Sequence, residues 1–238
     1  FDRVIDIWGA DHQGHVSRMK TAIEALGIPS NKLDIIISQM VSLRRDNEVV
    51  KVSKRTGDII TLREVMDEVG PDVMRFMMLF RKNEAPLDFD FAKVTEQSKD
   101  NPVFYVQYAH ARVCSVMRQA ARDMAGLDIS PVALAKADTG LLVDEGEAGL
   151  IRKLAEYPRI IDAAARAHEP HRLAFYLYEL ASLLHAQWNK GRDLPNLRFI
   201  HQENAPLTLA RLALVHAVST ILASGLAIIG ADAPEEMR

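Results

Sequence analysis

The chain has 238 residues, 48% of them hydrophobic and 26% charged, so it can bury a core, and disordered and collagen-like proteins are excluded. Its 29 Lys and Arg against 32 Asp and Glu give a net charge of −3, so nucleic-acid binding would have to come from local basic patches. The single cysteine, Cys114, excludes an intramolecular disulfide and a CxxC metal site, and it favours a reducing, cytoplasmic location.

The first sixty residues mix short β-branched runs with glycine turns. Residues 4–8 and 33–37 read as buried strands, and residues 11–26 between them read as a helix that Gly27 ends. Strand, helix and strand in this order predict a parallel pair with a crossover helix. Residues 38–45 are compatible with a strand or a loop.

From Thr61 onward the pattern becomes helical. Thr61 and Glu64 have the spacing of a capping box, and Gly70 with Pro71 should end one helix and begin the next. The segment 127–147 is irregular and acidic and reads as a surface loop. The clearest helical segments are residues 101–122, 149–168, 171–190 and 206–229. We place the boundary between an α/β part and an all-α part near residue 90.

The last of these helices is apolar on nearly every side. Such a helix is typical of the buried centre of a bundle. A membrane role is disfavoured because Arg211 and His216 interrupt it, and no apolar run in the chain reaches the ~20 residues of a membrane span.

The run Trp8-Gly9-Ala10-Asp11-His12-Gln13-Gly14-His15 follows the first predicted strand and opens a helix, which is where α/β folds bind ligands. Gly9 would let a ligand approach the backbone, and Asp11 could accept ribose hydroxyls. The simpler interpretation is a strand-to-helix turn with Asp11 as the N-cap. The HxGH tetrapeptide from His12 to His15 is typical of ATP sites, but here it lies too near the next motif. No third ligand accompanies the histidine pair, so no metal site is predicted.

The second motif is Lys51-Val52-Ser53-Lys54-Arg55-Thr56-Gly57. Two lysines around a serine, with a glycine after them, suit a loop that grips phosphate, because a flexible ammonium can reach a leaving pyrophosphate. A lone motif of this kind would more often be a solvated basic turn.

Together the two motifs resemble class I aminoacyl-tRNA synthetases, and arginyl-tRNA synthetases in particular. The resemblance continues through the segment DNPVFYVQYAHAR, residues 100–112, and through LAFYLYELA, His185, Trp188-Asn189 and the ending GL…APE. It covers essentially the whole chain. The lysine loop reads KVSKR where the superfamily pattern is KMSKS, and both lysines are kept.

This resemblance implies the fold class, namely the C-terminal part of a class I synthetase nucleotide-binding (Rossmann-like) fold over residues 1–90, followed by an α-helical anticodon-binding domain over residues 91–238. It also implies that the arginine pocket and a true HIGH motif lie upstream. The chain begins at Phe1 without a methionine. We therefore expect a fragment, monomeric, not associated with membranes and inactive alone.

The family reaction would join arginine to ATP and then to the tRNA for arginine. By resemblance, Gly9, Asp11 and His12 bind the adenosine end of ATP, and Lys51, Ser53 and Lys54 close over the triphosphate. Mg²⁺ would accompany ATP, and catalysis would be positioning and charge stabilisation without a protein nucleophile.

The helix at residues 101–122 carries the clearest basic patch of the chain. Arg112 and Arg118 could contact tRNA phosphates, and Tyr105, Gln107 and Tyr108 could stack on or hydrogen-bond to anticodon bases. Packing of both tyrosines between helices is an equal alternative. Trp188, at the end of another helix, is more typical of core than of a base platform.

Two other functions remain open from the sequence. The chain could be a tRNA-binding module without catalysis, or a small nucleotidylyl-transferase that uses His12 and His15. The latter would need a complete fold around these residues.

Overall fold

The chain begins with two parallel strands joined by a helical connection. The computed structural model describes residues 1–45, 48–50, 60–96, 98 and 101–237. Strand β1 (Val4–Gly9) pairs with β2 (Leu33–Ser38), with Val4 opposite Leu33 and Gly9 opposite Ser38. The positions of the predicted strands and their parallel order are confirmed, but the expected burial of β1 is wrong, because no residue of β1 is buried. Among the described residues, β1 pairs with another strand along one edge only. Its residues Ile5 and Ile7 are exposed.

The predicted helix at residues 11–26 forms in two pieces. Its first part is a 3₁₀ helix (Ala10–His15), and α1 (Val16–Ala25) follows. Neither piece buries a side chain completely. Gly27, at φ 80°, ends the unit in a conformation that glycine adopts without strain.

A second sheet has β3 (Val41–Arg45) between β4 (Glu48–Val49) and β5 (Leu87–Asp90). Strand β3 runs antiparallel to β4 and parallel to β5, so the segment 38–45 is largely strand. The Asn83 side-chain amide donates to the Ile37 carbonyl at 2.9 Å, which ties this sheet to β2. Every strand in the described part of the chain precedes residue 91.

Three short helices accompany the second sheet: α2 (Leu62–Val69), α3 (Pro71–Leu79) and α4 (Phe91–Thr95). The capping box at α2 is confirmed. The Glu64 amide donates to Thr61 Oγ1 at 3.2 Å, and the Thr61 amide donates to the Glu64 carboxylate at 2.6 Å. The break before α3 is also confirmed, with Gly70 at φ 84° and Pro71 in the first turn.

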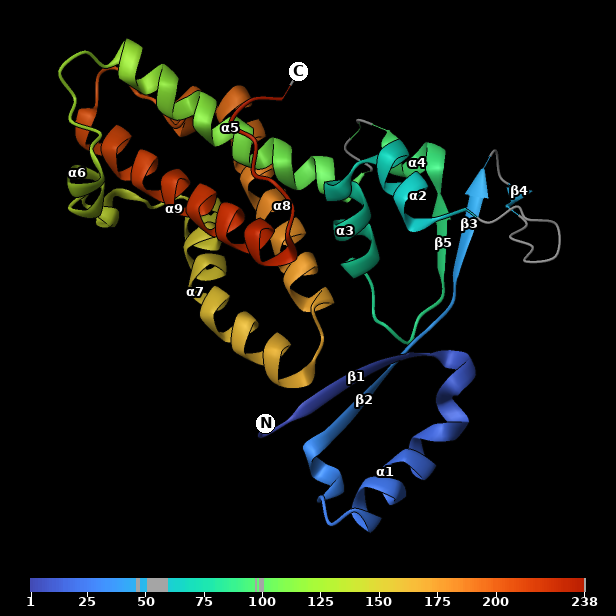
Figure 1. The fold of residues 1–238 in the computed structure, drawn as a ribbon. Helices are drawn as coiled ribbons and strands as arrows, with labels where there is room; N and C mark the ends of the chain where they lie inside the picture. Colours follow the sequence, from blue (N-terminus) through green and yellow to red (C-terminus); the bar gives the residue numbers. More distant parts are fainter. Residues whose placement is uncertain (46–47, 51–59, 97, 99–100, 238) are drawn as a thin grey trace.

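Four long helices form a bundle that lies above the β1–α1–β2 unit in the view of Figure 1. They are α5 (Pro102–Asp123), α7 (Glu145–Ala167), α8 (His171–Asp193) and α9 (Ala205–Ile229). Helices α8 and α9 each contact the other three, so α9 shares the centre of the bundle with α8. A Cβ atom at Gly225 of α9 would lie 2.5 Å from a Leu177 methyl carbon, so glycine allows α8 to approach closely. Helix α9 is long and apolar enough to cross a membrane, and half of its most apolar window is buried in the protein.

The segment 127–147 is more ordered than predicted. It contains α6 (Pro131–Ala135) and a 3₁₀ helix (Thr139–Leu141), and Leu134 and Leu142 are buried. Helix α7 begins at Glu145, four residues before the predicted start. The cause is a second capping box, in which the Asp144 amide donates to the Glu147 carboxylate at 3.2 Å.

After α9 the chain turns back along α5, and we refer to residues 231–237 as the C-terminal tail. Figure 1 shows this tail in red beside the green α5. His110 Nδ1 lies 2.9 Å from the Pro234 carbonyl oxygen, and the Gln107 side chain donates to the Asp232 carbonyl at 3.0 Å. The tail therefore covers part of the helix that carries the predicted tRNA-binding residues.

Candidate functional site

The residues predicted to bind ATP lie together at the carboxyl end of β1. Asp11 and His12 are exposed in the 3₁₀ helix, and Asp11 Oδ2 is 3.6 Å from His12 Nε2. A Cβ at Gly9 would lie 2.7 Å from Asp11 Oδ1, so glycine lets this carboxylate fold back over the strand end. Asp11 is not the N-cap of α1, because that position belongs to His15. A role in binding ATP stays a prediction.

The lysine loop falls in the segment 51–59, so Lys51, Ser53 and Lys54 lie outside the described residues. Its flanks are described. The Val50 amide donates to the Leu43 carbonyl at 2.8 Å, and the capped helix α2 follows. The assignment of these three residues to phosphate binding stays a prediction.

A cluster of one arginine, two aromatic side chains and a histidine joins α5 to α8. We call Tyr108, Arg112, His185 and Trp188 the arginine–aromatic cluster. The Arg112 guanidinium carbon lies 4.5 Å from the centre of the Tyr108 ring and 4.7 Å from that of Trp188. Arg112 Nη2 also donates to the Tyr108 hydroxyl at 3.0 Å. Cation–π contacts on two rings hold the guanidinium in one orientation.

His185 contacts the other members of this cluster as a neutral imidazole. Arginine has no acceptor, so the 2.7 Å contact between Arg112 Nη1 and His185 Nδ1 makes Nδ1 the acceptor. The other nitrogen, Nε2, then donates to the Tyr105 carbonyl at 3.2 Å. The pKa of His185 is lowered from 6.5 to about 4, mainly by burial and also by the Arg112 charge, while the hydrogen bond to the Tyr105 carbonyl acts in the opposite direction. A protonated His185 would lose its bond from Arg112.

The stability of the chain should therefore depend on pH through His185. The folded-state pKa lies below the unfolded value, so the unfolded chain binds the extra proton between pH 6.5 and 4. Stability from this group is complete above pH 6.5 and is lost as the pH falls, by at most about 1.4 kcal/mol per pH unit. Urea unfolding across this range should show a smaller loss in His185→Gln than in the parent. Carboxylates titrate in both proteins, so parallel curves would contradict the assignment.

Tyr105 and Tyr108 occupy different environments. Tyr105 is partly buried, with its ring centre 5.1 Å from that of Tyr178 and 4.5 Å from that of His185. Tyr108 is 46% exposed and stacks on His185 at 5.7 Å between ring centres. The packing alternative therefore describes Tyr105, whereas Tyr108 offers a ring to solvent.

The prediction that Gln107 contacts bases is corrected by its position. Gln107 is 6% exposed, and its amide nitrogen donates to the Asp72 carboxylate at 2.8 Å and to the Asp232 carbonyl. Both hydrogens of the amide are used inside the protein. Gln107 therefore connects α5 to α3 and to the tail, and it is not part of the candidate RNA-binding surface.

Arg118 lies six residues beyond Arg112 on α5 and is exposed. Its Nη2 is 3.4 Å from Glu236 Oε1 and 3.4 Å from the Glu235 carbonyl oxygen. A cavity of about 360 Å³ lies between this pair and the cluster, lined also by Met237. The basic patch predicted on α5 is thus partly neutralised by the tail.

Two features of this site escaped the sequence reasoning. The acidic pair Glu235 and Glu236 is distant in sequence from α5, so nothing local assigns it to Arg118. Trp188 was expected to be core, yet it is partly exposed and faces Arg112. The spacing of His185 and Trp188 on one helix, three residues apart, could have indicated a shared face.

The structure does not bring the residues predicted to bind ATP at the end of β1 close to those predicted to bind tRNA on α5. Neither cavity described at the bundle is lined by Gly9, Asp11 or His12, and Figure 1 places α1 away from α5. In the described part of the chain, no group of three or more His, Cys, Asp or Glu side chains could hold a metal ion.

Residues 106–237 match the family described as the DALR anticodon binding domain. The bundle with its arginine–aromatic cluster is therefore an anticodon-binding domain of this family. The division predicted at residue 90 stays a prediction.

Comparisons over nearly the whole length of this chain agree with one another. The chain is 62% identical to an arginine–tRNA ligase of Beijerinckia indica over 235 residues, which are 99% of the chain and 40% of that relative. A ligase of the same name from Allorhizobium ampelinum is 59% identical over 238 residues, with 100% and 40% covered. The chain thus spans about 40% of the length of these curated relatives.

Solved structures show the same kinship. A Campylobacter jejuni protein assigned to the arginyl-tRNA synthetases superposes with a TM-score of 0.84 at 31% identity, covering 99% of this chain and 48% of that one. The Thermus thermophilus arginyl-tRNA synthetase gives a TM-score of 0.72 at 25% identity, with 99% and 41% covered. The chain belongs to the arginyl-tRNA synthetase family.

Proposed function

We propose that the chain binds the anticodon loop of an arginine tRNA through the arginine–aromatic cluster, as part of an arginine–tRNA ligase. The observation that carries this proposal is a half-exposed tyrosine, an oriented guanidinium and a tryptophan on one surface of the anticodon-binding domain. Unstacked RNA bases are commonly recognised by stacking on aromatic rings and arginine planes.

In this proposal the members of the site have distinct tasks. Tyr108 provides the stacking face, which is worth about 1–3 kcal/mol per base. Arg112 supplies charge to the phosphate chain and keeps the Tyr108 ring in place. Arg118 can add a phosphate contact once the RNA displaces the Glu236 carboxylate. Tyr105 supports the cluster from within, through its ring contact with His185.

The catalytic part of the proposal rests on the sequence motifs. Gly9, Asp11 and His12 would hold the adenosine of ATP in a Rossmann-like fold, and Lys51, Ser53 and Lys54 would hold its triphosphate. Mg²⁺ would enter with ATP and neutralise phosphate charge. The arginine carboxylate attacks the α-phosphate and pyrophosphate leaves, which gives arginyl-adenylate. A ribose hydroxyl of the terminal adenosine of the tRNA then attacks the arginyl carbonyl, and AMP leaves. We place this activity in the cytoplasm, where the free Cys114 would stay reduced.

Replacing Tyr108 tests the anticodon assignment. Tyr108→Ala should weaken binding of an arginine tRNA by about 5- to 150-fold, because a stacking surface worth about 1–3 kcal/mol is lost. Tyr108→Phe keeps the ring and loses only the hydroxyl that accepts from Arg112, so most affinity should remain. Filter binding at fixed salt measures both, together with a tRNA of the same body and an exchanged anticodon.

Discrimination is the decisive quantity in this experiment. The parent should prefer the arginine anticodon, and Tyr108→Ala should lose most of that preference. If Tyr108→Ala lowers affinity equally for both RNAs, or if the parent shows no preference, the anticodon-reading role is rejected. Melting temperatures of the same proteins show whether a weaker variant is still folded.

A further inference from the structure

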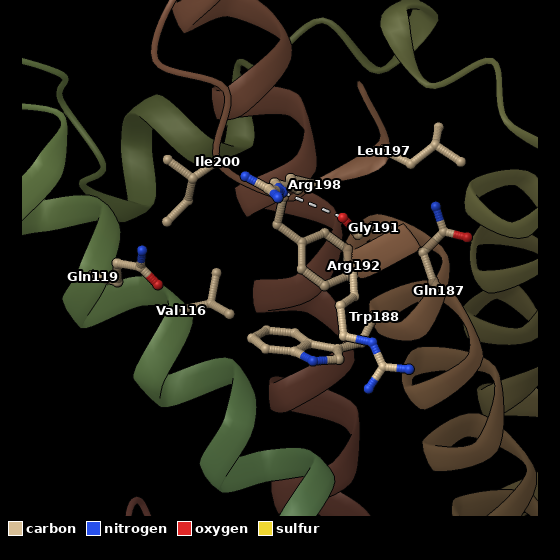
Figure 2. A pocket seen from close by; sticks show the side chains of 10 residues that line it. Val116, Gln119, Gln187, Trp188, Gly191, Arg192, Leu197, Arg198 and Ile200 are labelled. Carbon is tan, nitrogen blue, oxygen red and sulfur yellow. Dashed lines mark hydrogen bonds between the residues drawn. The ribbon is translucent and has the colours of Figure 1, made fainter. Parts of the chain in front are cut away.

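A second cavity lies beside the arginine–aromatic cluster, and Trp188 is a wall of both. This cavity holds about 310 Å³ between α5, α8 and the segment that follows α8. We call it the α5–α8 pocket, and its lining includes Val116, Gln119, Trp188, Arg198, Phe199 and Ile200. Figure 2 shows the Trp188 indole along one side, with Val116 and Gln119 of α5 at another.

The walls of the pocket are fixed by the packing around it. Trp188 and Phe199 meet at 6.1 Å between ring centres, and Phe199 is buried. A Cβ at Gly191 would lie 2.9 Å from the Leu197 carbonyl oxygen, so glycine permits the segment after α8 to lie against that helix. The buried Arg211 donates to the Asn196 carbonyl at 2.8 Å and to the Arg198 carbonyl at 2.7 Å, which pins the same segment from the other side.

The rim of the pocket is cationic and polar, unlike its interior. Arg198 and Arg192 are both exposed, and Figure 2 shows the Arg198 guanidinium extending toward Ile200. Arg198 is held by one long bond, from Nε to the Gly191 carbonyl at 3.4 Å, and Arg192 lies 3.5 Å from Asp193. On α5, the exposed amide of Gln119 donates to Asp123 at 3.0 Å and can exchange this partner for a base edge.

We infer that the α5–α8 pocket takes the base of a second unstacked nucleotide of the same RNA loop, with its phosphate at Arg198. The inference rests on the proposed function, because the RNA must already lie on the cluster. An aromatic ring joined to an anion matches an apolar cavity with arginines at its rim. A volume of about 310 Å³ is at the small end for ligand pockets, which suits one base better than a larger ligand.

The shared tryptophan gives the reason for a second nucleotide rather than an unrelated ligand. Tyr108, Arg112 and Trp188 line the cavity at the cluster, and Trp188 lines the α5–α8 pocket as well. A strand whose first base stacks in the cluster thus passes the mouth of the second cavity. An apolar protein side chain would fill the interior equally well but would add no contact to Arg198 or Gln119 beyond those they make with Gly191 and Asp123.

Blocking the pocket tests the inference on the 238-residue chain with anticodon stem-loops of an arginine tRNA. The probes are the parent stem-loop and a set with one abasic nucleotide at each loop position. Gln119→Trp places an indole in the cavity from an exposed position, so the fold should persist. We expect the parent protein to lose about 5-fold or more at two abasic positions. Gln119→Trp should bind the intact loop as weakly as the parent protein binds an abasic loop. At one of the two positions, removing the base should not weaken the binding of Gln119→Trp any further.

Arg198→Gln provides the second measurement. Removing one phosphate contact should lower the log–log salt slope of binding by about 0.7, the value for one phosphate of a single strand. Arg166→Gln is the matched control, because Arg166 is exposed near the C-terminal end of α7 and forms an ion pair with Asp162. Its slope should equal that of the parent.

The outcomes separate this inference from the proposed function. If Tyr108→Ala weakens binding while Gln119→Trp leaves affinity and abasic sensitivity unchanged, the pocket does not hold a base, although the cluster still binds the loop. If the parent does not bind the stem-loop, both the proposed function and the subsite are overturned.

Discussion

Arg211→Ala should lower the free energy of unfolding by about 3–5 kcal/mol, because it leaves a buried carboxylate without its partner. Arg211 Nε donates to Glu147 Oε1 at 2.6 Å, and the two side chains are 4% and 1% exposed. The same guanidinium satisfies the carbonyls of Asn196 and Arg198, so the variant also releases the segment after α8. Urea unfolding followed by circular dichroism measures the loss.

The double variant Glu147→Leu/Arg211→Met provides the control for this buried pair. Apolar replacement of both partners should cost less than Arg211→Ala alone, since no unpaired charge remains. Arg166→Ala breaks an exposed pair with Asp162, so its unfolding midpoint should stay close to that of the parent. A single variant Arg211→Ala as stable as the parent would show that the pair is not coupled to folding.

Arg112→Ala should weaken binding of an arginine tRNA by about 10- to 100-fold, or roughly 1.4–2.8 kcal/mol. The change removes a cation from the RNA surface and the contacts that hold the Tyr108 and Trp188 rings. Arg112→Lys keeps the charge without the planar fork, so it should recover the salt dependence but only part of the affinity. Fluorescence anisotropy with labelled tRNA over a salt series separates the two contributions.

Arg118→Gln is the matched comparison for this cation. In the described part of the chain Arg118 contacts the tail and no aromatic ring, so its loss should lower the salt slope by up to about 1 with little change in anticodon preference. Equal effects of Arg112→Ala and Arg118→Gln on affinity and preference would mean that the cluster contributes only charge.

The sequence predicted those helix ends that are set by contacts between residues a few positions apart. Thr61 and Glu64 form the expected capping box because both partners lie within one turn. The segment 127–147 was predicted less well, since α6 is five residues long and depends on packing of Leu134 rather than on periodicity. The start of α7 was missed although Asp144 and Glu147 carry the same capping spacing.

The sequence predicted which helix carries the candidate site, but not which of its side chains are exposed. Helical spacing places Tyr105, Tyr108 and Arg112 near one another, yet it does not say which face the tail covers. Gln107 was misassigned for this reason, because its partner Asp232 is 125 residues away in sequence. The neutral state of His185 likewise depends on burial between two helices, which no local pattern reports.

The sheet of β1 and β2 has a consequence for how the chain behaves in concentrated solution. In the part of the chain that the structure describes, β1 pairs with β2 on one edge, so the other edge carries free amide and carbonyl groups beside the exposed Ile5 and Ile7. A bare strand edge with apolar side chains is a template for a strand from another molecule. Aggregation of the purified chain should therefore begin at these two strands while the helical bundle stays folded, and a lysine on β1 would be the direct remedy.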